Sequence, residues 1–263
     1  MENFETIDLN ADQNGIAYLT LDREDKRNAL SALMLTELAA AAKKIDQSDD
    51  IRVVILTGAG ETFCAGADLA WMREQMAADV DTRAREATRL AETLFALNTL
   101  SKPLIGALQG NAFGGGVGLA SVCDVVFGAS HIKMALTEVK LGIIPATIGP
   151  YVYARIGEAE CRRLFLSGRT FESDEALNCG LLSRVTHSSE LWEEVEDEAY
   201  SFLSCAPGAV AAAKKLARSF GVSIDQDTIA MTIAALKERW ETEEAAEGIS
   251  AFFEKRPPYW KLK

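Results

Sequence analysis

Two glycine-rich segments are the parts of this sequence best suited to chemistry. Residues 57–68 (TGAGETFCAGAD) and 109–116 (QGNAFGGG) each follow an apolar run and precede a segment with helical periodicity. A glycine turn that enters a helix leaves backbone N–H groups unpaired, and glycine lets a ligand oxygen approach them closely. One N–H group from each turn, directed at a single oxygen, would form an oxyanion hole. The alternative is that these glycines serve only tight packing between strand and helix.

Other common catalytic motifs are missing from the sequence or match it loosely. There is no GxxxxGK[ST] phosphate-binding loop and no GxSxG nucleophile elbow. Residues 114–118 (GGGVG), with Glu138 about twenty residues further on, loosely match a dinucleotide-binding fingerprint. If Gly116 and Gly118 are the first two glycines of that motif, Ser121 takes the place of the third. An NAD-type oxidoreductase is therefore kept only as an alternative.

Composition narrows the class of protein. The chain has 263 residues, of which 48% are hydrophobic and 25% charged, as in an ordinary globular protein. Its net charge of -12 disfavours nucleic acid and anionic membranes as partners. We expect a cytoplasmic protein, because the sequence lacks a membrane-length apolar run and a signal peptide. Two histidines, and five cysteines without a CxxC pair, predict buried reduced thiols and no metal site.

The elements that must position the glycine turns alternate between strand and helix. The order of strand, glycine turn and helix occurs twice, which predicts an α/β body with successive crossovers. Beyond about residue 206 the pattern becomes helical, and the acidic run 241–247 is expected to be a solvated helix face. The expected elements are a hairpin over 6–21 turning at Asn14-Gly15, a helix over 32–45 capped by Ser31, strands over 52–56, 104–108 and 125–127, and helices from 69, over 79–97, 117–122, 209–219 and 224–253.

Four blocks of sequence resemble the signature regions of the crotonase superfamily, the enoyl-CoA hydratases and isomerases. They are residues 22–30 (DREDKRNAL), 56–69 (LTGAGETFCAGADL), 110–124 (GNAFGGGVGLASVCD) and 137–145 (TEVKLGIIP). The resemblance covers nearly the whole chain in the same order. It implies an α/β spiral of repeated ββα units, with a core over 1–205 and a helical trimerisation region over 206–263. A homotrimer or homohexamer would follow.

The resemblance also implies roles for particular residues. The N–H groups of Ala67 and Gly115 would bind the carbonyl oxygen of an acyl-CoA thioester, and Glu138 would be the catalytic carboxylate. The acyl-CoA is the substrate, and no separate cofactor is implied. Asp68 is expected to cap a helix and Asp124 to have a structural role. The residues expected to line the CoA and acyl groove are Lys26, Arg27, Ala65, Asp68, Leu69, Gly118, Phe252 and Lys255, the last two often reaching a neighbouring subunit's CoA.

Gly118 departs from the family pattern, because many hydratases carry a second glutamate at this position. With a single carboxylate, Glu138 could still deprotonate a water that attacks Cβ of an enoyl-CoA and return the proton to Cα. The same lone base would suit a Δ3,Δ2-enoyl-CoA isomerase. The missing side chain at Gly118 is expected to free volume for a branched or carboxylated acyl chain.

The strings GNAFGGGVGL and LTEVKLGIIPATIGPYV are most similar to the bacterial methylglutaconyl-CoA hydratases of leucine breakdown. We therefore predict hydration of 3-methylglutaconyl-CoA or another branched enoyl-CoA. A general enoyl-CoA hydratase, an isomerase and a catalytically silent acyl-CoA-binding homologue are the alternatives. Arg85, Arg89 and Lys140 are the cations that could meet a carboxylate on the acyl chain.

Overall fold

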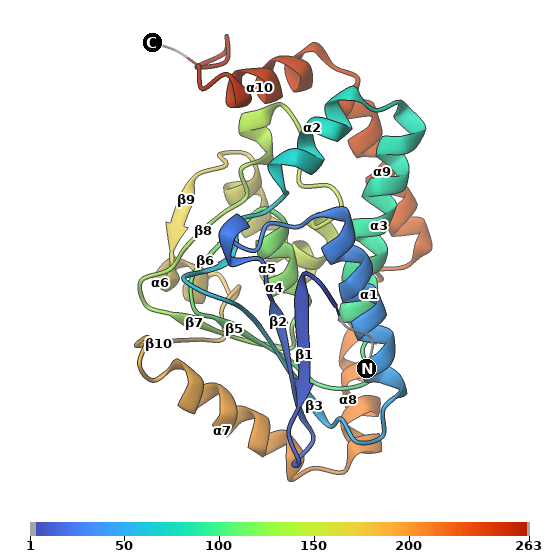
Figure 1. Ribbon diagram of the computed structural model, residues 1–263, viewed down its shortest axis with the longest axis vertical. Helices are drawn as coiled ribbons and strands as arrows, with labels where there is room; N and C mark the ends of the chain where they lie inside the picture. The colour runs from blue at the N-terminus through green and yellow to red at the C-terminus, as the bar shows by residue number, and fades with distance from the viewer. Residues whose placement is uncertain (1–3, 262–263) are drawn as a thin grey trace.

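The computed structural model describes residues 4–261, so residues 1–3 and 262–263, at the outer ends of the two expected regions, lie outside the described residues. Two β-sheets form the centre of the molecule, and helices surround them (Figure 1). This confirms the predicted α/β class with a C-terminal helical part.

The larger sheet has six strands in the order β1-β2-β3-β5-β7-β10. The predicted hairpin is formed by β1 (Ile7–Ala11) and β2 (Ile16–Leu21), and the remaining neighbours pair in parallel. All six residues of β3 (Val53–Gly58) are buried, as an apolar run covered on both faces requires. The other strands are β5 (Leu104–Leu108), β7 (Val125–Ala129) and β10 (Arg184–Thr186).

The smaller sheet has the order β4-β6-β8-β9. Three strands run parallel, namely β4 (Thr62–Cys64), β6 (Asn111–Phe113) and β8 (Lys133–Ala135), and β9 (Thr170–Glu172) pairs antiparallel to β8. The expectation that residues 109–116 form only a loop is wrong, because β6 lies within them. A strand of three residues is too short to show a period in the sequence.

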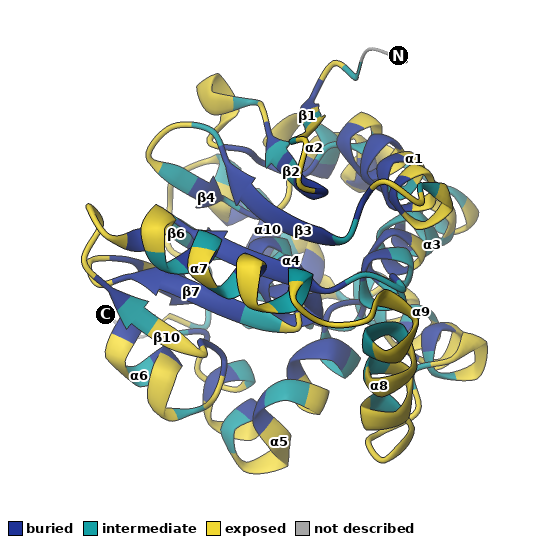
Figure 2. Ribbon diagram, turned by 90° about the horizontal axis from the view of Figure 1, so that it is seen from below, coloured by how far each residue is buried: buried dark blue, intermediate teal, exposed yellow. Residues whose placement is uncertain are grey.

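Helices cover the sheets on both sides. Figure 2 shows α7 (Leu191–Leu203) crossing in front of the larger sheet, whose strands are buried beneath it. Ser31 caps α1 (Ala32–Gln47), as predicted, by accepting a hydrogen bond from the Met34 N–H. The remaining helices of the core are α2 (Leu69–Ala77), α3 (Val80–Asn98), α4 (Gly115–Val122), α5 (Gly149–Phe165) and α6 (Ser173–Asn178).

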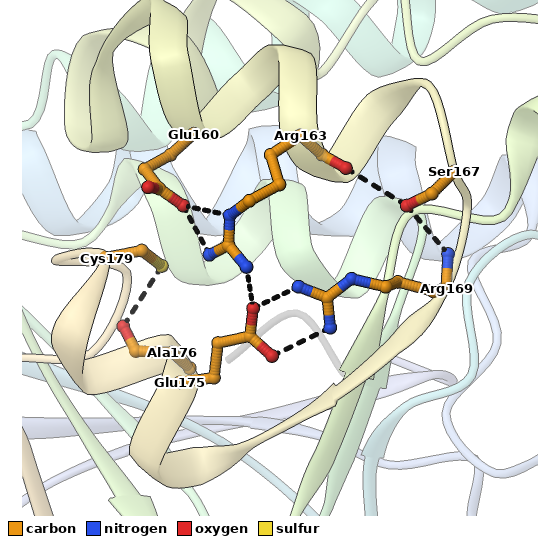
Figure 3. Close-up of polar contacts among 7 residues, drawn as sticks. All are labelled: Glu160, Arg163, Ser167, Arg169, Glu175, Ala176 and Cys179. Atoms are coloured by element: carbon orange, nitrogen blue, oxygen red, sulfur yellow. Dashed lines mark hydrogen bonds and ion pairs between the residues drawn. The ribbon is translucent and has the colours of Figure 1, made fainter.

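A cluster of charged side chains joins the end of α5 to α6 beside β9 (Figure 3). The carboxylate of Glu175 accepts hydrogen bonds from both Arg163 and Arg169, and Arg163 also donates to Glu160. The two guanidinium groups lower the pKa of Glu175 to about 2. The cluster holds the turn that carries the outer strand of the smaller sheet.

The C-terminal region consists of α8 (Pro207–Ser219), α9 (Gln226–Trp240) and α10 (Glu243–Phe253). The prediction of a single helix over 224–253 is wrong, because α9 ends at Trp240 with Glu241 as its C-cap. Thr242 is the N-cap of the separate helix α10. The acidic run is not simply solvated either, since three of its carboxylates are paired. The pairs are Glu241 with Arg83, Glu244 with Arg239, and Glu247 with Arg256.

The last helix packs closely on the 3-10 turn η2 (Glu138–Leu141). A Cβ atom on Gly248 would lie 2.4 Å from the carbonyl carbon of Leu141, so the two backbones touch only because Gly248 has no side chain. Arg239 adds a hydrogen bond from Nε to the Gly142 carbonyl oxygen (2.8 Å). Rather than a loose appendage, α10 supports the turn that carries Glu138.

The cysteines depart in part from the prediction. Cys64, Cys123 and Cys161 are buried free thiols, whereas Cys179 is half-buried and Cys205 is exposed. Burial raises the pKa of Cys64 to about 12, so this thiol stays neutral at physiological pH.

Gly248→Ala tests the close packing of α10 on η2. The added methyl group overlaps the Leu141 backbone, so we expect a loss of about 1–3 kcal/mol in the free energy of unfolding, measured by urea denaturation. The matched control is Gly208→Ala in α8, where no atom lies within 4 Å of the new methyl group and the expected change is below about 1 kcal/mol. Equal stability of the two variants would contradict the packing described.

Candidate active site

A cavity of about 530 Å³ lies between the smaller sheet and the helices α2, α3, α9 and α10. These helices gather at the top and right of the molecule in Figure 1. The wall is mostly apolar, and it includes six of the predicted site residues. They are Ala65, Ala67, Leu69, Gly115, Glu138 and Phe252.

The three predicted catalytic residues each follow one strand of the smaller sheet. Ala67 lies three residues after β4, and Glu138 lies three residues after β8. Gly115 is the first residue of α4, two residues after the end of β6. Because β4, β6 and β8 are adjacent and parallel, their carboxyl ends meet at one edge of the sheet. The topology therefore brings together residues that are far apart in the sequence.

Glycines with positive φ precede both backbone donors. Gly66 has φ +92° and Gly114 has φ +48°, conformations that side-chain-bearing residues rarely adopt. The two turns are in contact, since a Cβ on Gly66 would lie 3.0 Å from the Phe113 carbonyl oxygen. Within residues 4–261 the N–H groups of Ala67 and Gly115 have no hydrogen-bond acceptor. Both are free to bind a ligand oxygen.

Leu30 connects the two turns. Its N–H donates to the Gly66 carbonyl (2.7 Å), and its own carbonyl accepts from the Asp68 N–H (2.9 Å). This pairing flanks Ala67 and leaves the Ala67 amide unused. On the other side, a Cβ on Gly115 would lie 2.5 Å from Leu30 Cδ1. The Leu30 side chain thus fixes the spacing between the two donors.

Asn28 is a structural residue of the site that the sequence analysis missed. It is fully buried with φ +53°, and its side chain accepts from the Arg23 N–H (2.9 Å) and donates to the carbonyls of Ala59 (2.8 Å) and Thr62 (2.7 Å). Asn28 therefore ties the segment before α1 to the first glycine turn. Asparagine adopts this left-handed backbone conformation more often than most other residues. The burial of Asn28, however, could not be predicted from the polar stretch in which it lies.

Two predicted structural carboxylates are confirmed. Asp68 caps α2 by accepting from the N–H groups of Ala70 (2.8 Å) and Trp71 (3.2 Å), and it pairs with Arg23 (2.9 Å). These contacts lower the pKa of Asp68. Asp124 accepts from the Leu104 N–H (2.8 Å) and pairs with Lys214 (2.7 Å), which anchors α8 to the sheet.

Glu138 has the features of a general base. Its Oε2 atom is buried without a hydrogen-bond partner in the described part of the chain, and Oε1 would lie 3.3 Å from a Cβ on Gly114. Burial raises the pKa of Glu138 from 4.5 to about 7. A base is most effective when its pKa lies near the working pH.

A second carboxylate in the cavity wall, Glu86, is already occupied. It accepts hydrogen bonds from Trp71 Nε1 (3.1 Å) and from two nitrogens of Arg89 (3.1 and 3.2 Å). Among the described residues that line the cavity, Glu138 is therefore the one carboxylate free to move a proton.

The volume expected at Gly118 is already filled. A Cβ on this residue would lie 2.5 Å from Cγ2 of Ile148, and it would also contact Leu94 at 3.7 Å. The expectation that Gly118 frees room for the acyl chain is therefore wrong. Ile148, which lines the cavity, takes the space beside Gly118, so a second glutamate could not be accommodated here without repacking.

Several predicted binding residues lie outside the cavity wall. Lys26 is exposed and pairs with Asp25 (3.2 Å), while the Arg27 carbonyl accepts from the Ala65 N–H (3.0 Å) next to the first turn. Lys255 follows α10 and is exposed. Of the three cations predicted for a substrate carboxylate, Lys140 lines the cavity, whereas Arg85 and Arg89 do not. Arg83 also lines it. Phe252 lines the cavity of its own chain.

Residues 4–261 hold neither a candidate membrane-spanning helix nor a candidate metal centre. No helix there combines the length and apolar character needed to cross a membrane. No group of three or more histidine, cysteine, aspartate or glutamate side chains is arranged to hold a metal ion.

Two free amides beside a buried carboxylate define a site for proton transfer next to a polarised carbonyl group. The chain belongs to the enoyl-CoA hydratase/isomerase family, whose sequence model matches residues 11–263. This confirms the superfamily that the signature blocks predicted. The methylglutaconyl-CoA substrate stays a prediction.

Relatives and solved structures match this chain over almost its whole length. A carnitinyl-CoA dehydratase from Proteus mirabilis is 36% identical over 255 residues, which cover 95% of this chain and 96% of the relative. A short-chain-enoyl-CoA hydratase from Clostridium acetobutylicum is 34% identical and covers 92% of each chain. A crystal structure of an enoyl-CoA hydratase from Shewanella pealeana has a TM-score of 0.81 at 33% identity, covering 98% of this chain and 97% of the other.

Gly118→Ala tests the packing that replaces the second glutamate. The new methyl group overlaps Ile148, so the expected loss is about 1–3 kcal/mol in the free energy of unfolding. In an Ile148→Ala background the overlap is relieved and the same substitution should cost less, which a double-mutant cycle by chemical denaturation measures. Equal costs in the two backgrounds would show that Ile148 does not fill this space.

The raised pKa of Glu138 predicts a pH-dependent stability difference. Between about pH 4.5 and 7 the folded protein binds more protons at this group than the unfolded chain, so the group makes stability fall as pH rises through that window. Glu138→Gln removes this contribution. The variant should therefore gain stability relative to the wild type between pH 5 and pH 8, measured by urea unfolding. A difference independent of pH would place the carboxyl group in solvent.

Proposed function

We propose that this protein hydrates 2-enoyl-CoA thioesters, using the N–H groups of Ala67 and Gly115 as an oxyanion hole and Glu138 as the only catalytic carboxylate. The observation that carries the proposal is the unpartnered, buried Oε2 of Glu138 at the same sheet edge as two unpaired amides. The enoyl-CoA hydratases among its relatives support it.

The proposed reaction is an addition of water across the double bond. The Glu138 carboxylate accepts a proton from water as the water oxygen forms a bond to Cβ, and the π electrons move toward the thioester oxygen. The two amides stabilise the resulting enolate oxygen. Glu138 then returns its proton to Cα, which regenerates the thioester carbonyl and the ionised base. One carboxylate on one face gives syn addition.

The amides and the base each contribute to the rate enhancement by an amount known from other enzymes. Each amide donor to an oxyanion is worth roughly 10²- to 10³-fold in rate. A positioned base adds about 10²- to 10⁴-fold. The apolar wall strengthens the electrostatic interactions because it excludes water.

The proposed acyl group is 3-methylglutaconyl or another branched enoyl chain. Support comes from the signature strings and from the cavity of about 530 Å³, whose wall carries the cationic side chain of Lys140. The CoA moiety is proposed to bind along Lys26, Arg27, Ala65, Asp68 and Leu69, with Lys255 nearby. The acyl-CoA itself is the substrate, and no further cofactor is proposed.

We further propose that residues 206–263 mediate assembly into a homotrimer or homohexamer. Large apolar side chains are exposed on and beside α8 and α9, which supports contact with another copy of the chain. They are Leu216, Phe220, Val222 and Met231. A cytoplasmic location stays a prediction.

A Δ3,Δ2-enoyl-CoA isomerase is the second candidate. The absence of a second free carboxylate from the described cavity wall favours it, since one base suffices to move a proton between Cγ and Cα. Isomerisation leaves the mass of the thioester unchanged, whereas hydration adds one water.

The test is a panel of enoyl-CoA thioesters assayed by product mass and by loss of conjugated-thioester absorbance. We expect a gain of water with the wild type and a kcat lower by about 10²- to 10⁴-fold in Glu138→Gln, with little change in acyl-CoA affinity. kcat/KM of the wild type should rise with pH through about 7, because the base must be ionised. Acyl-CoA binding without any turnover would instead identify a silent homologue, and full activity of Glu138→Gln would remove Glu138 from its role.

A further inference from the structure

Two buried side-chain atoms in the described chain lack a hydrogen-bond partner, and both belong to residues of the cavity wall. One is Oε2 of Glu138, which the proposed reaction uses, and the other is Oε1 of Gln75. Gln75 lies on α2 and is only 9% exposed. A buried side-chain oxygen without a hydrogen-bond partner is unfavourable in the free protein. We therefore expect the Gln75 side chain to meet a polar group of a ligand.

The helices α2, α3 and α9 contribute further residues to the cavity wall. Met72, Ala87, Leu90, Leu236 and Trp240 present apolar surface. Gln75 is thus a carboxamide in a mostly apolar wall, formed by helices that are separate from the two glycine turns and from η2.

The two charged side chains that α3 contributes to the wall, Arg83 and Glu86, are each ion-paired with a partner outside the wall. All three guanidinium nitrogens of Arg83 donate hydrogen bonds, Nε and Nη2 to the Ala78 carbonyl (3.1 and 2.9 Å) and Nη1 to Glu241 (2.6 Å). Glu86 is held in the same way by Trp71 and Arg89. None of these hydrogen bonds involves the carboxamide of Gln75, whose Oε1 stays without a partner in the described chain.

We propose that Gln75 is a specificity-determining residue that binds an oxygen-bearing group on the acyl chain, a hydroxyl or a carboxylate, and that the preferred substrates carry such a group. The inference rests on the proposed function, since it assumes that the acyl chain of an enoyl-CoA occupies this cavity. A carboxamide can accept a hydrogen bond from a hydroxyl through Oε1 and donate one to either group through Nε2. A plain alkyl chain would leave the carboxamide unpaired, which disfavours it.

The experiment compares three 2-enoyl-CoA thioesters of equal chain length that end in a methyl group, a hydroxymethyl group or a carboxylate. The wild type should prefer at least one oxygen-bearing substrate over the methyl one. Gln75→Met, nearly equal in size and shape, should lower kcat/KM for that substrate by about 10- to 100-fold and change the methyl substrate by less than about threefold.

Gln75→Glu distinguishes a hydroxyl group on the acyl chain from a carboxylate. A carboxylate at this position accepts a hydrogen bond from a hydroxyl but repels a substrate carboxylate, so retained activity on the alcohol indicates a hydroxyl ligand. For the thioester that ends in a carboxylate, a larger loss of kcat/KM in Gln75→Glu than in Gln75→Met indicates a carboxylate ligand. Either result supports the proposal.

Two controls separate a substrate-binding role from a structural one. Gln75→Met removes an unpaired polar group, so the melting temperature of the free protein should stay equal or rise. Affinity for the corresponding saturated thioesters, measured by calorimetry, should show the same preference even if turnover fails. The proposal is overturned if Gln75→Met affects all three thioesters equally, or if the wild type binds the methyl compound best. A wild type that hydrates none of them contradicts the proposed function instead.

Discussion

The parallel pairing of β4, β6 and β8 is the constraint on which the rest of the site depends. Each strand has only three residues, yet their pairing sets the carboxyl ends of three distant segments side by side. A shift of one residue in the register would move Gly115 relative to Ala67 and would turn side chains to the opposite face. The larger sheet, Asn28 and α10 hold these short strands and their turns in place.

The site carries features that are unfavourable for folding by themselves. Two backbone amides have no acceptor within the described residues, and buried oxygens of Glu138 and Gln75 are unpartnered there. Such features persist only where surrounding structure outweighs them, and they concentrate at functional sites. Here the surroundings are the buried strands of the larger sheet and the close contact of Gly248 with η2.

The sequence predicted most of the long elements and the two glycine turns because these leave strong local signals. The apolar run of β3, the cap at Ser31 and the two glycine turns all lie where the pattern indicated. What could not be predicted depends on contacts between distant segments. The missing side chain at Gly118 suggests free volume, but in the fold Ile148 occupies that volume. The strands β4 and β6 are too short to show a hydrophobic period in the sequence. The break between α9 and α10 rests on Thr242, one polar residue in an acidic run, and the buried carboxamide of Gln75 follows the charged residues Arg73 and Glu74 in α2.

The most direct measurement is a crystal structure of the protein with a saturated acyl-CoA, which binds but has no double bond to hydrate. The proposed two-amide oxyanion hole predicts a thioester oxygen within roughly 2.7–3.1 Å of the nitrogens of both Ala67 and Gly115, with the Glu138 carboxyl group facing Cα and Cβ. A thioester oxygen bound to only one of these amides, or an acyl chain on the side of the turns away from Glu138, would contradict it.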